Sequence, residues 1–365
     1  MGKYDDKIKA LEEEIKKTKY NKATQGHIGI LKAKIAQLKD ASAQRSAQKT
    51  GQSDYGFTVR KSGDGSVILL GFPSTGKSTL LNKLTGAGSE VGSYAFTTLT
   101  VEPGMMEHKQ AKIQILDVPG IVSGAASGKG RGREVLTVIR NADMILLVVD
   151  ATQPQQYEAV VKEAREAHIR MNKRKPDVWI TKKGRGGIQI GKTVPLDVDD
   201  DTLKRILRQF RVNNADVLIR SKVDVDDFID VIEGNKKYLP SVVCVTKADL
   251  VTKVELKKIM KRVHADIAIS AHTGWNIEKL KDLVFEHLDF MRIYMKEPRK
   301  DADMEIPLII TRDSSIRGVG HKLHKDFVKK FKFARVWGPS AKFAGQRLML
   351  HHVLKDGDIL ELHIH

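Results

Sequence analysis

The segment Val67-Ile68-Leu69-Leu70-Gly71-Phe72-Pro73-Ser74-Thr75-Gly76-Lys77-Ser78 joins a short apolar run to a glycine-rich loop. The loop fits the pattern G-x-x-x-x-G-K-[ST], and the residues after it have the composition of a helix. Glycines let backbone N–H groups approach a phosphate, and the N-terminus of a helix adds partial positive charge. The alternative is a glycine-rich turn before a buried helix. We interpret the segment as a nucleotide phosphate site made of Gly71, Phe72, Pro73, Ser74, Thr75, Gly76, Lys77, Ser78 and Thr79.

Four more apolar runs of strand length follow along the chain. They are Ile113–Leu116, Met144–Val149, Ser241–Val245 and Ile267–Ile269. Continuous apolar strands that alternate with helical segments are typical of a parallel sheet covered on both faces. The sequence therefore predicts an α/β fold with a mostly parallel sheet.

Two polar motifs follow these strands directly. Asp117-Val118-Pro119-Gly120 ends the second strand, where Asp117 can hold the Mg²⁺ shell and the Gly120 N–H can sense a γ-phosphate. Thr246-Lys247-Ala248-Asp249 follows the fourth strand and resembles the guanine-binding Asn-Lys-x-Asp element of GTPases. The Asp249 carboxylate can accept hydrogen bonds from the ring N1–H and the exocyclic amine of guanine, a pair that adenine lacks. Lys247 is expected to lie over the base. Thr246 has fewer hydrogen-bonding groups than the usual Asn, which predicts weaker guanine affinity.

Two further segments complete the predicted site for GTP or GDP. Ser270-Ala271-His272 resembles the loop that closes a guanine pocket through its backbone. Phe96, Thr97 and Thr98 lie between the phosphate loop and the second strand, where a γ-phosphate-sensing threonine is needed. We favour Thr98 over Thr97 by resemblance; the alternative is a run of strand-forming residues. Catalytic roles are assigned to Lys77, Thr98 and Gly120, and Mg²⁺ binding to Ser78, Thr98 and Asp117.

These motifs resemble the Obg-related GTPases, and specifically the developmentally regulated GTP-binding (DRG) family. The resemblance runs through essentially the whole chain, and Thr246 is its main departure. The matching stretches are Asn21–Thr24, Leu31–Lys34, Gly71–Ser78, Phe96–Thr100, Gly128–Arg133, Val231–Asn235 and Phe331–Gly338. The resemblance implies a helical N-terminal region, a P-loop GTPase domain, an inserted subdomain and a C-terminal TGS domain with a ubiquitin-like β-grasp fold.

The pattern along the chain agrees with four such parts. Residues 1–50 form the helical region, residues 63–172 and 239–297 the two pieces of the GTPase domain, 173–238 the inserted α/β subdomain and 298–365 the TGS domain. The insert is inferred because the third strand and its helix are followed by a long stretch before the next apolar strand.

Local patterns refine these parts. Apolar residues at helical spacing predict a two-helix hairpin at the N-terminus, or else a single long coiled helix, with a break near Asn21–Thr24. The small, polar stretch Ala41–Gly56 is interpreted as a linker. Further helices are expected at Gln155–Met171, Leu203–Phe210 and His321–Lys332.

The residue after Gly120 is Ile121, where Ras-like enzymes place a Gln that orients the attacking water. Isoleucine cannot do this, so slow intrinsic hydrolysis is expected. Arg131 and Arg133 could stabilise charge in the reaction, or they could contact a partner or RNA phosphate. Potassium could also replace an arginine finger; potassium-using relatives have an Asn where this chain has Ser74, so a potassium role stays open.

The net charge of +18 lies mostly outside the nucleotide-binding core. Residues 1–50 carry 12 basic and 6 acidic side chains, residues 170–237 carry 16 and 11, and residues 299–365 carry 13 and 8, so 16 of the 18 net charges are on three appendages. Such basic arms indicate a polyanionic partner, and the resemblance implies the ribosome or ribosomal RNA. An activating protein is conceivable but unidentified. Neither a membrane nor DNA is expected as a partner.

A single cysteine excludes a disulfide-framed secreted protein, and neither a signal peptide nor an apolar run of ~20 residues is present. We therefore expect a cytoplasmic protein, which we take to be a monomer. The leading functional hypothesis is a GTP-hydrolysing switch on ribosomes. The alternatives are an RNA- or ribosome-binding adaptor with nucleotide as a structural ligand, and an ATPase, which Asp249 opposes.

Overall fold

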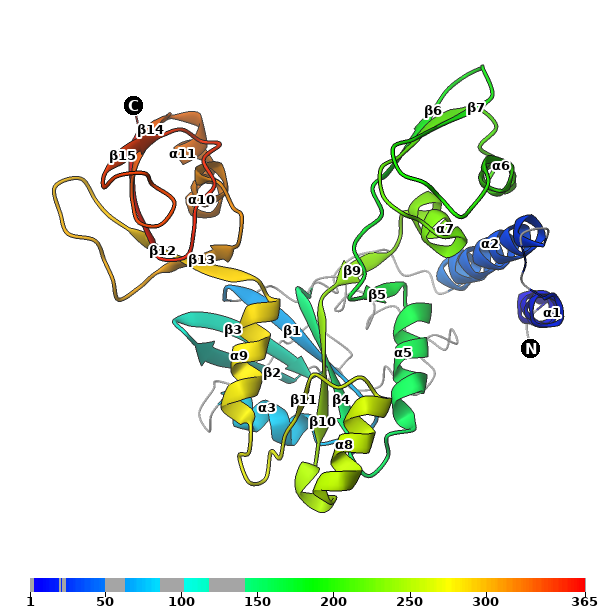
Figure 1. Ribbon diagram of the computed structural model, residues 1–365, viewed down its shortest axis with the longest axis horizontal. Coiled ribbons are helices and arrows are strands. Elements are labelled where there is room, and N and C mark those ends of the chain that lie inside the picture. The colour runs from blue at the N-terminus through cyan, green and yellow to red at the C-terminus, as the bar shows by residue number, and fades with distance from the viewer. Residues whose placement is uncertain are drawn as a thin grey trace. The chain divides into compact units, whose positions relative to one another are not determined.

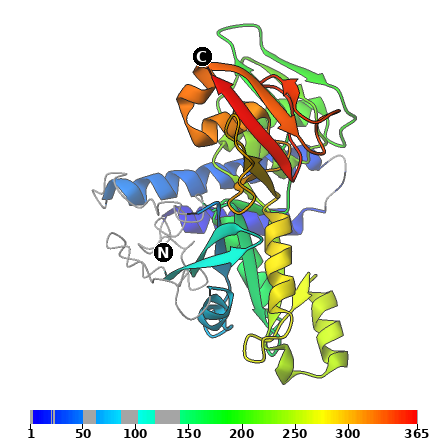
Figure 2. The same cartoon turned by 90° about the vertical axis from the view of Figure 1, so that its left-hand side faces the viewer.

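The structure is a computed structural model that describes residues 3–19, 21, 24–49, 63–85, 102–117 and 142–364 (Figures 1 and 2). The chain divides into two compact units. One contains Met1–Gly56 and Ala164–Tyr238, and the other contains Phe57–Glu163 and Leu239–His365. The residues of the expected insert are thus grouped with the N-terminal helices rather than with the strands that flank them in sequence.

A six-stranded sheet forms the core of the second unit, in the order β11-β10-β4-β1-β3-β2. Its strands are β1 (Gly65–Leu70), β2 (Glu102–His108), β3 (Ala111–Asp117), β4 (Met144–Asp150), β10 (Ser241–Thr246) and β11 (Ile267–Ala268). Neighbouring strands are parallel, except that β2 runs antiparallel to β3 at one edge. All five apolar runs expected as strands are strands, so the predicted α/β fold with a mostly parallel sheet is confirmed.

Helices cover this sheet on both faces. They are α3 (Lys77–Thr85), α5 (Gln156–Glu166), α8 (Lys253–Arg262) and α9 (Ile277–His287), with a 3₁₀ turn at Ala248–Leu250. Leu80 of α3 and Leu280 of α9 belong to one apolar cluster with Val67, Ile115 and Leu146 of the strands. In Figure 1, α5 and α8 lie on the opposite side of the strands from α3 and α9. Because both faces are covered, every residue of β1, β4 and β10 is buried.

The C-terminal part of this unit is a second, five-stranded sheet in the order β13-β12-β16-β14-β15. Its elements are β12 (Phe290–Met295), β13 (Leu308–Thr311), α10 (Ile316–Leu323), α11 (Lys325–Lys329), β14 (Phe331–Trp337), β15 (Gln346–Leu348) and β16 (Asp358–Ile364). The sheet begins with β12, so the boundary expected at residue 298 falls after its first strand. Phe290 also packs into the apolar cluster of the core sheet, where its ring fills the space beside Gly65.

The helix expected at His321–Lys332 is displaced: α10 begins at Ile316, and Phe331 already belongs to β14. Ile316 and Val319 are fully buried, which holds the helix despite two glycines that favour helix poorly. A side chain at Gly320 would come within 2.9 Å of Val328, so the glycine lets α11 pack closely against α10. The alternation Phe331-Lys332-Phe333 has the period of a strand, which the sequence interpretation overlooked.

The first unit contains two N-terminal helices, α1 (Lys3–Lys17) and α2 (Gln25–Lys49). The expected break is confirmed: the Asn21 N–H donates to Thr24 Oγ1 at 3.0 Å, and the Thr24 N–H donates to Asn21 Oδ1 at 2.9 Å. The two helices are linked by Glu14 and His27, whose side chains lie 3.0 Å apart. The expected linker at Ala41–Gly56 is wrong up to Lys49, because α2 continues to that residue. The first glycine after Ala41 is Gly51, and the residues before it tolerate helix well.

The insert is a three-stranded sheet in the order β6-β8-β7, with two helices on one face. Its elements are β6 (Val178–Lys182), β7 (Ile188–Lys192), α6 (Asp200–Gln209), β8 (Ala215–Ile219) and α7 (Val225–Glu233). The strands β5 (Ile169–Met171) and β9 (Lys237–Leu239) flank the insert in sequence and pair with each other as a two-stranded sheet. The last three residues of the helix expected at Gln155–Met171 are therefore a strand.

Helix α2 packs on α6 and α7 and completes the core of the insert. Ala33 is fully buried in the same cluster as Leu203, Ile206 and Phe228. The side-chain amides of Gln37 and Gln209 lie 2.9 Å apart, and Gln37 Nε2 also donates to the carbonyl oxygen of Gln209. The N-terminal helices and the insert are therefore one structural unit.

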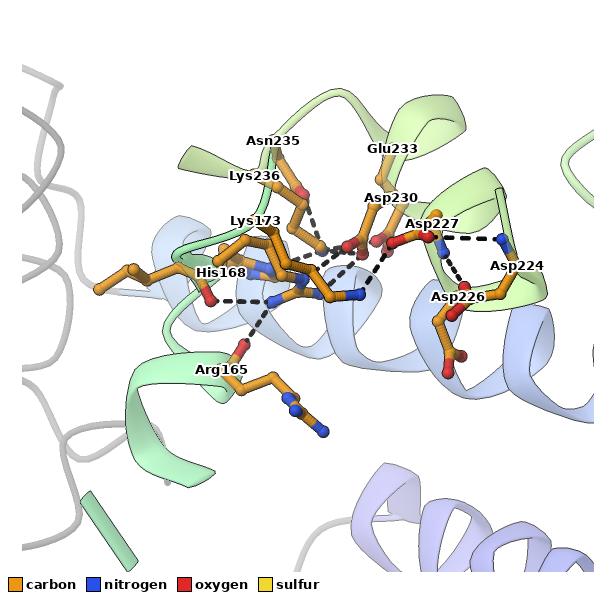
Figure 3. A network of polar contacts seen from close by, with 12 residues as sticks. Arg165, His168, Lys173, Asp224, Asp226, Asp227, Asp230, Glu233, Asn235 and Lys236 are labelled. Atoms are coloured by element: carbon orange, nitrogen blue, oxygen red, sulfur yellow. Dashed lines mark hydrogen bonds and ion pairs between the residues drawn. The ribbon is translucent and has the colours of Figure 1, made fainter. Parts of the chain in front are cut away.

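A buried network of ion pairs connects β5, α7 and the residues just before β9 (Figure 3). The Arg170 guanidinium donates to both carboxylate oxygens of Asp230, at 2.5 and 2.7 Å. Lys236 Nζ contacts Glu233 at 2.5 Å and the ring Nδ1 of His168 at 2.8 Å. Two cations and two carboxylates thus pair within a region that excludes water, which is what burial of charge requires. Burial raises the pKa of Glu233, although Lys236 opposes the shift.

Candidate nucleotide site

Those predicted site residues that the structure describes lie at one edge of the core sheet. The phosphate loop follows β1, Asp117 ends β3, Thr246 ends β10, and Ser270 lies just beyond β11. Since these strands are parallel, their carboxyl ends share an edge, which is where ligands bind in open α/β sheets. Register places Leu69 beside Asp117, and Thr246 beside Asp150.

The phosphate loop has the backbone that its glycines predict. A Cβ on Gly71 would lie 2.4 Å from the carbonyl oxygen of Val148, so no side chain fits there. Gly76 has a φ of +87°, and a Cβ there would meet no atom within 4 Å, which leaves open space beside the loop. The Thr75 hydroxyl donates to the Phe72 carbonyl oxygen at 2.9 Å and closes the turn. Helix α3 begins directly afterwards, at Lys77.

Lys77, Ser78 and Asp117 form the phosphate end of the site. Lys77 Nζ donates to the carbonyl oxygens of Gly71 and Phe72, at 3.0 and 2.8 Å. Ser78 Oγ donates to Asp117 Oδ2 at 3.0 Å, and Asp117 Oδ1 is buried with no hydrogen-bond partner among the described residues. Burial lowers the pKa of Lys77, with Asp117 opposing the shift. Burial also raises the pKa of Asp117, against the effects of Lys77 and Ser78.

Thr246 and Lys247 connect the end of β10 to the phosphate loop. The buried Thr246 hydroxyl lies 2.7 Å from the carbonyl oxygen of Thr75 and 3.2 Å from that of Val149. Lys247, with a φ of +55°, donates from Nζ to the Ser74 carbonyl oxygen at 2.8 Å. The structure thus directs both side chains to the phosphate loop, a connection that the motif alone did not indicate.

Asp150 is a site residue that the sequence interpretation missed. Its Oδ2 accepts a hydrogen bond from Lys247 Nζ at 2.6 Å, and its Oδ1 accepts from the N–H and hydroxyl of Thr152, at 2.8 and 2.7 Å. Burial acts to raise the pKa of Asp150, but the hydrogen bonds from Lys247 and Thr152 outweigh it and lower the pKa. A carboxylate directly after the apolar strand Met144–Val149 was the available signal.

The base end of the site is exposed to solvent. The Asp249 side chain is exposed, and a hydrogen bond from the buried Ser270 is the main cause of its lowered pKa. The Ser270 hydroxyl oxygen also accepts from the Thr273 N–H at 3.2 Å, which orders the loop that contains Ala271 and His272. Recognition of two adjacent N–H groups requires an exposed carboxylate such as this one.

Several predicted residues cannot be compared with the structure. Phe96, Thr97, Thr98, Val118, Pro119 and Gly120 lie outside the described residues, as do Ile121, Arg131 and Arg133. Within the described part, no group of three or more His, Cys, Asp or Glu side chains could hold a metal ion, and no helix is long and apolar enough to cross a bilayer.

Comparison with protein families divides the chain into three consecutive matches. Residues 66–183 match a family described as "50S ribosome-binding GTPase". Residues 185–290 match the "C-terminal region of MMR_HSR1 domain", and residues 291–364 match the TGS domain. The expected GTPase and TGS domains are therefore confirmed.

Comparison with individual proteins extends the similarity to the whole chain. An uncharacterised GTP-binding protein of Methanocaldococcus jannaschii is 49% identical over 98% of this chain and 92% of its own length. Developmentally-regulated G-protein 3 of Arabidopsis thaliana is 44% identical over 99% of both chains. The solved Schizosaccharomyces pombe YchF GTPase covers 83% of this chain and 99% of its own, with a TM-score of 0.44 and 12% identity, which is too distant to carry a functional argument. Since the two close relatives match nearly end to end, the chain belongs to the family of GTP-binding proteins with a C-terminal TGS domain that includes the developmentally regulated G-proteins.

Proposed function

We propose that this protein is a Mg²⁺-dependent GTPase that acts as a ribosome-associated switch in translation, and more specifically a member of the DRG branch of its family. The observation that carries the proposal is the convergence of Lys77, Ser78, Asp117 and Asp249 on one edge of the core sheet. Lys77 is positioned for the β- and γ-phosphates, and Asp249 for the guanine edge. The family membership makes GTP hydrolysis the general activity.

The residues present fit a magnesium ion. A hard cation prefers oxygen ligands, and the Ser78 hydroxyl and Asp117 carboxylate supply them at the mouth of the phosphate loop. Asp117 Oδ1 is buried without a hydrogen-bond partner in the part of the chain that the structure describes, which leaves acceptor capacity that a bound cation or its water would use. Thr98 is proposed as a further ligand. When bound, Mg²⁺ neutralises charge on the phosphates; the chain's own contribution is to orient them through Lys77 and the backbone of Gly71–Ser78.

Hydrolysis in the isolated protein is proposed to be slow. Ile121 stands where a water-orienting Gln is usual, so positioning rests on Lys77, Thr98 and the Gly120 N–H. Acceleration would then come from a partner, from Arg131 and Arg133 of the chain itself, or from a potassium ion. Equal rates in potassium and sodium buffers would eliminate the last of these.

The ribosome is the proposed partner, and the cytoplasm the proposed location, with the chain acting as a monomer. Two observations support the partner: the description of the matching family as ribosome-binding, and the concentration of 16 of the 18 net positive charges in the residue ranges 1–50, 170–237 and 299–365. We propose that the N-terminal helices, the insert and the TGS domain bind RNA, while the GTPase core switches between states.

The test is GTP turnover with and without purified ribosomes, with sedimentation measured in parallel across salt concentrations. We expect ribosomes to stimulate phosphate release, and binding to weaken as salt rises, because phosphate contacts release counterions. Lys77→Ala should abolish turnover, whereas Lys83→Ala, an exposed lysine on the same helix, should not. Absence of turnover even with ribosomes would favour the adaptor alternative, in which nucleotide is only a structural ligand.

A further inference from the structure

The sheet of the insert has one covered face and one open face. Residues such as Val217 and Ile219 point to α6 and α7 and belong to the apolar cluster of the unit. The alternate residues line an open cavity of about 680 Å³ on the other face. The lining includes Trp179, Thr181, Gln189, Gly191, Leu218 and Arg220, together with one carboxylate, that of Asp216. An exposed sheet face with a tryptophan is unusual, since large aromatic side chains are normally well buried.

The centre of this face is an apolar row that spans all three strands. Register places Trp179 of β6 opposite Leu218 of β8, and Leu218 opposite Gly191 of β7. Trp179 is 64% exposed, and its indole Nε1–H donates to Asp177 Oδ1 at 2.8 Å, which holds the ring in place. Gly191 adds no side chain, and the nearest atom to a Cβ there would be Leu218 Cδ1 at 3.6 Å. The indole ring of Trp179 therefore lies beside an open part of the sheet surface, over Leu218 and Gly191, where a planar group can stack.

Basic residues outnumber acidic ones around this row, although three of the lysines are paired: Lys173 with Asp227, Lys183 with Asp216 and Lys192 with Asp200. The segments 173–192 and 215–222 carry nine exposed basic residues against two acidic ones, Asp177 and Asp216. The basic residues are Lys173, Arg174, Lys175, Lys182, Lys183, Arg185, Lys192, Arg220 and Lys222. Asp177 accepts from Trp179, and Asp216 pairs with Lys183. The other nine acidic residues of the insert lie in the ranges 197–201 and 224–233, at the N-terminus of α6 and on α7.

The basic loop between β6 and β7 is held in one shape. Asn214 accepts the Lys183 N–H at its carbonyl oxygen, at 3.0 Å, and the Gly187 N–H at Oδ1, at 2.9 Å. Gly186 and Gly187 have φ values of +106° and +72°, and a Cβ on either would meet no atom within 4 Å. The loop thus presents cationic side chains and an uncovered backbone at one end of the strands, while Arg220 stands at the other end, about 16 Å away at strand geometry.

We propose that this open face of the insert binds single-stranded RNA, with a base stacked on Trp179 and the flanking phosphates held by Arg220 and by the basic loop. Base–aromatic stacking combined with a cationic track is how sequence-tolerant single-strand sites work. A duplex hides its base faces, so it would meet only the cations. The biological setting rests on the proposed ribosome association, but direct RNA binding does not depend on it.

The test measures the affinity of the full-length protein, with GDP present, for a fluorescent oligouridine of about 12 nucleotides and for an RNA duplex of the same length. Trp179→Ala should weaken oligouridine binding about tenfold and leave duplex binding nearly unchanged. Trp179→Phe, which keeps a stacking surface, should retain most of the affinity. Val254→Ala, which shortens an apolar side chain that is 66% exposed on α8 of the GTPase core, is the control. Equal oligouridine affinity for Trp179→Ala and this control would overturn the proposal.

The cations give a second, independent measurement. Arg220→Ala should weaken oligouridine binding and reduce the slope of log affinity against log salt by about one contact, whereas Lys257→Ala on α8 should not. Basal GTP turnover should be the same in every variant, because none of these residues lies at the nucleotide site. If the salt slope is unchanged in Arg220→Ala, the proposed contact between Arg220 and a phosphate is wrong.

A photo-crosslinking amino acid in place of Trp179 separates this proposal from the proposed function. Crosslinks to ribosomal RNA would support the surface, and crosslinks only to ribosomal protein would overturn it in favour of a protein partner. If the wild type sediments with ribosomes and Trp179→Ala does so equally, with unchanged oligouridine affinity, the ribosome proposal stands and the RNA surface fails. Oligouridine binding that requires Trp179, in a protein that never sediments with ribosomes, would support the RNA surface and contradict the ribosome proposal.

Discussion

The two ends of the nucleotide site differ in how far their charged groups are removed from water. At the phosphate end, burial lowers the pKa of Lys77 and raises the pKa of Asp117, so both charged forms are held at a cost. At the base end, Asp249 is exposed, and the hydrogen bond from Ser270 lowers its pKa. A bound phosphate can offset the cost of charging Lys77, and a bound cation that of charging Asp117, whereas the second end presents a ready acceptor. Affinity should therefore reside mainly with the phosphates, and selectivity with the base.

Thr246 and Lys247 join these two ends. One follows the other at the end of β10, and their side chains reach the Thr75 and Ser74 carbonyl oxygens of the phosphate loop. Asp150 also accepts a hydrogen bond from Lys247. The difference between the two ends can thus be tested at three places: at the base end, at Thr246 and Lys247, which link the ends, and at the phosphate end.

The largest effect is expected at the base end. Asp249→Asn replaces an acceptor for two N–H groups with an amide, and should lower affinity for GDP and GTP roughly 100-fold. Affinity for xanthosine diphosphate should rise, because the amide N–H can donate to the carbonyl that xanthine has in place of the amine. Competition against a labelled nucleotide measures all three.

Asp301→Asn, on an exposed segment remote in sequence from every site residue, controls for loss of one negative charge. A uniform loss of affinity for guanine, xanthine and adenine nucleotides in Asp249→Asn would contradict selective base recognition. It would mean that the carboxylate supports the loop rather than the ligand.

The contrast also explains what could be predicted from the sequence. Gly71–Ser78, Asp117 and Asp249 were found because each directly follows or ends an apolar strand, and parallel strands bring such ends to one edge. Asp150 lies at the end of a strand too, but it was not part of a familiar motif. Its contact with Lys247 depends on the positive φ of that residue, which no local pattern indicates.

Long-range packing was the other missing information. Nothing in the spacing of apolar residues says that Ala33 of α2 is buried against the insert, so the N-terminal helices were expected as a separate part. The glycines of α10 masked a helix that burial of Ile316 and Val319 stabilises. In both cases tertiary contacts decide the structure where local propensity is weak.

An intermediate effect is expected at the link. Thr246→Val removes a hydroxyl that contacts two buried carbonyl oxygens, and leaving such groups unpaired costs about 1–3 kcal/mol. Because one of the carbonyls belongs to Thr75 of the phosphate loop, affinity for GDP should fall about tenfold. The inosine nucleotide, which lacks the exocyclic amine, should lose affinity by the same factor.

Thr246→Ser keeps the hydroxyl and should bind both nucleotides nearly as the wild type does. If Thr246→Val instead changes the ratio between guanosine and inosine nucleotides, the threonine acts at the base end. The sequence-based expectation that it weakens guanine recognition would then be correct.

The smallest effect is expected in the nucleotide-free protein, at the phosphate end. The raised pKa of Asp117 means that ionising this carboxyl costs more in the folded than in the unfolded chain, so its contribution to stability declines as pH rises through the folded pKa. Asp117→Asn should therefore raise the melting temperature slightly at pH 7. The difference should vanish below pH 3.8, the ordinary pKa of the group, where the carboxyl is protonated in both states.

With GDP and Mg²⁺ added, the wild type should have the higher melting temperature, because its carboxylate then gains a ligand that the amide cannot hold as well. Thermal unfolding with and without nucleotide, at several pH values and with Asp301→Asn as control, measures both parts. A lower melting temperature for Asp117→Asn in the nucleotide-free state would mean that the pairing with Lys77 and Ser78 outweighs desolvation. The phosphate end would then be preformed like the base end, and the difference between the two would be lost.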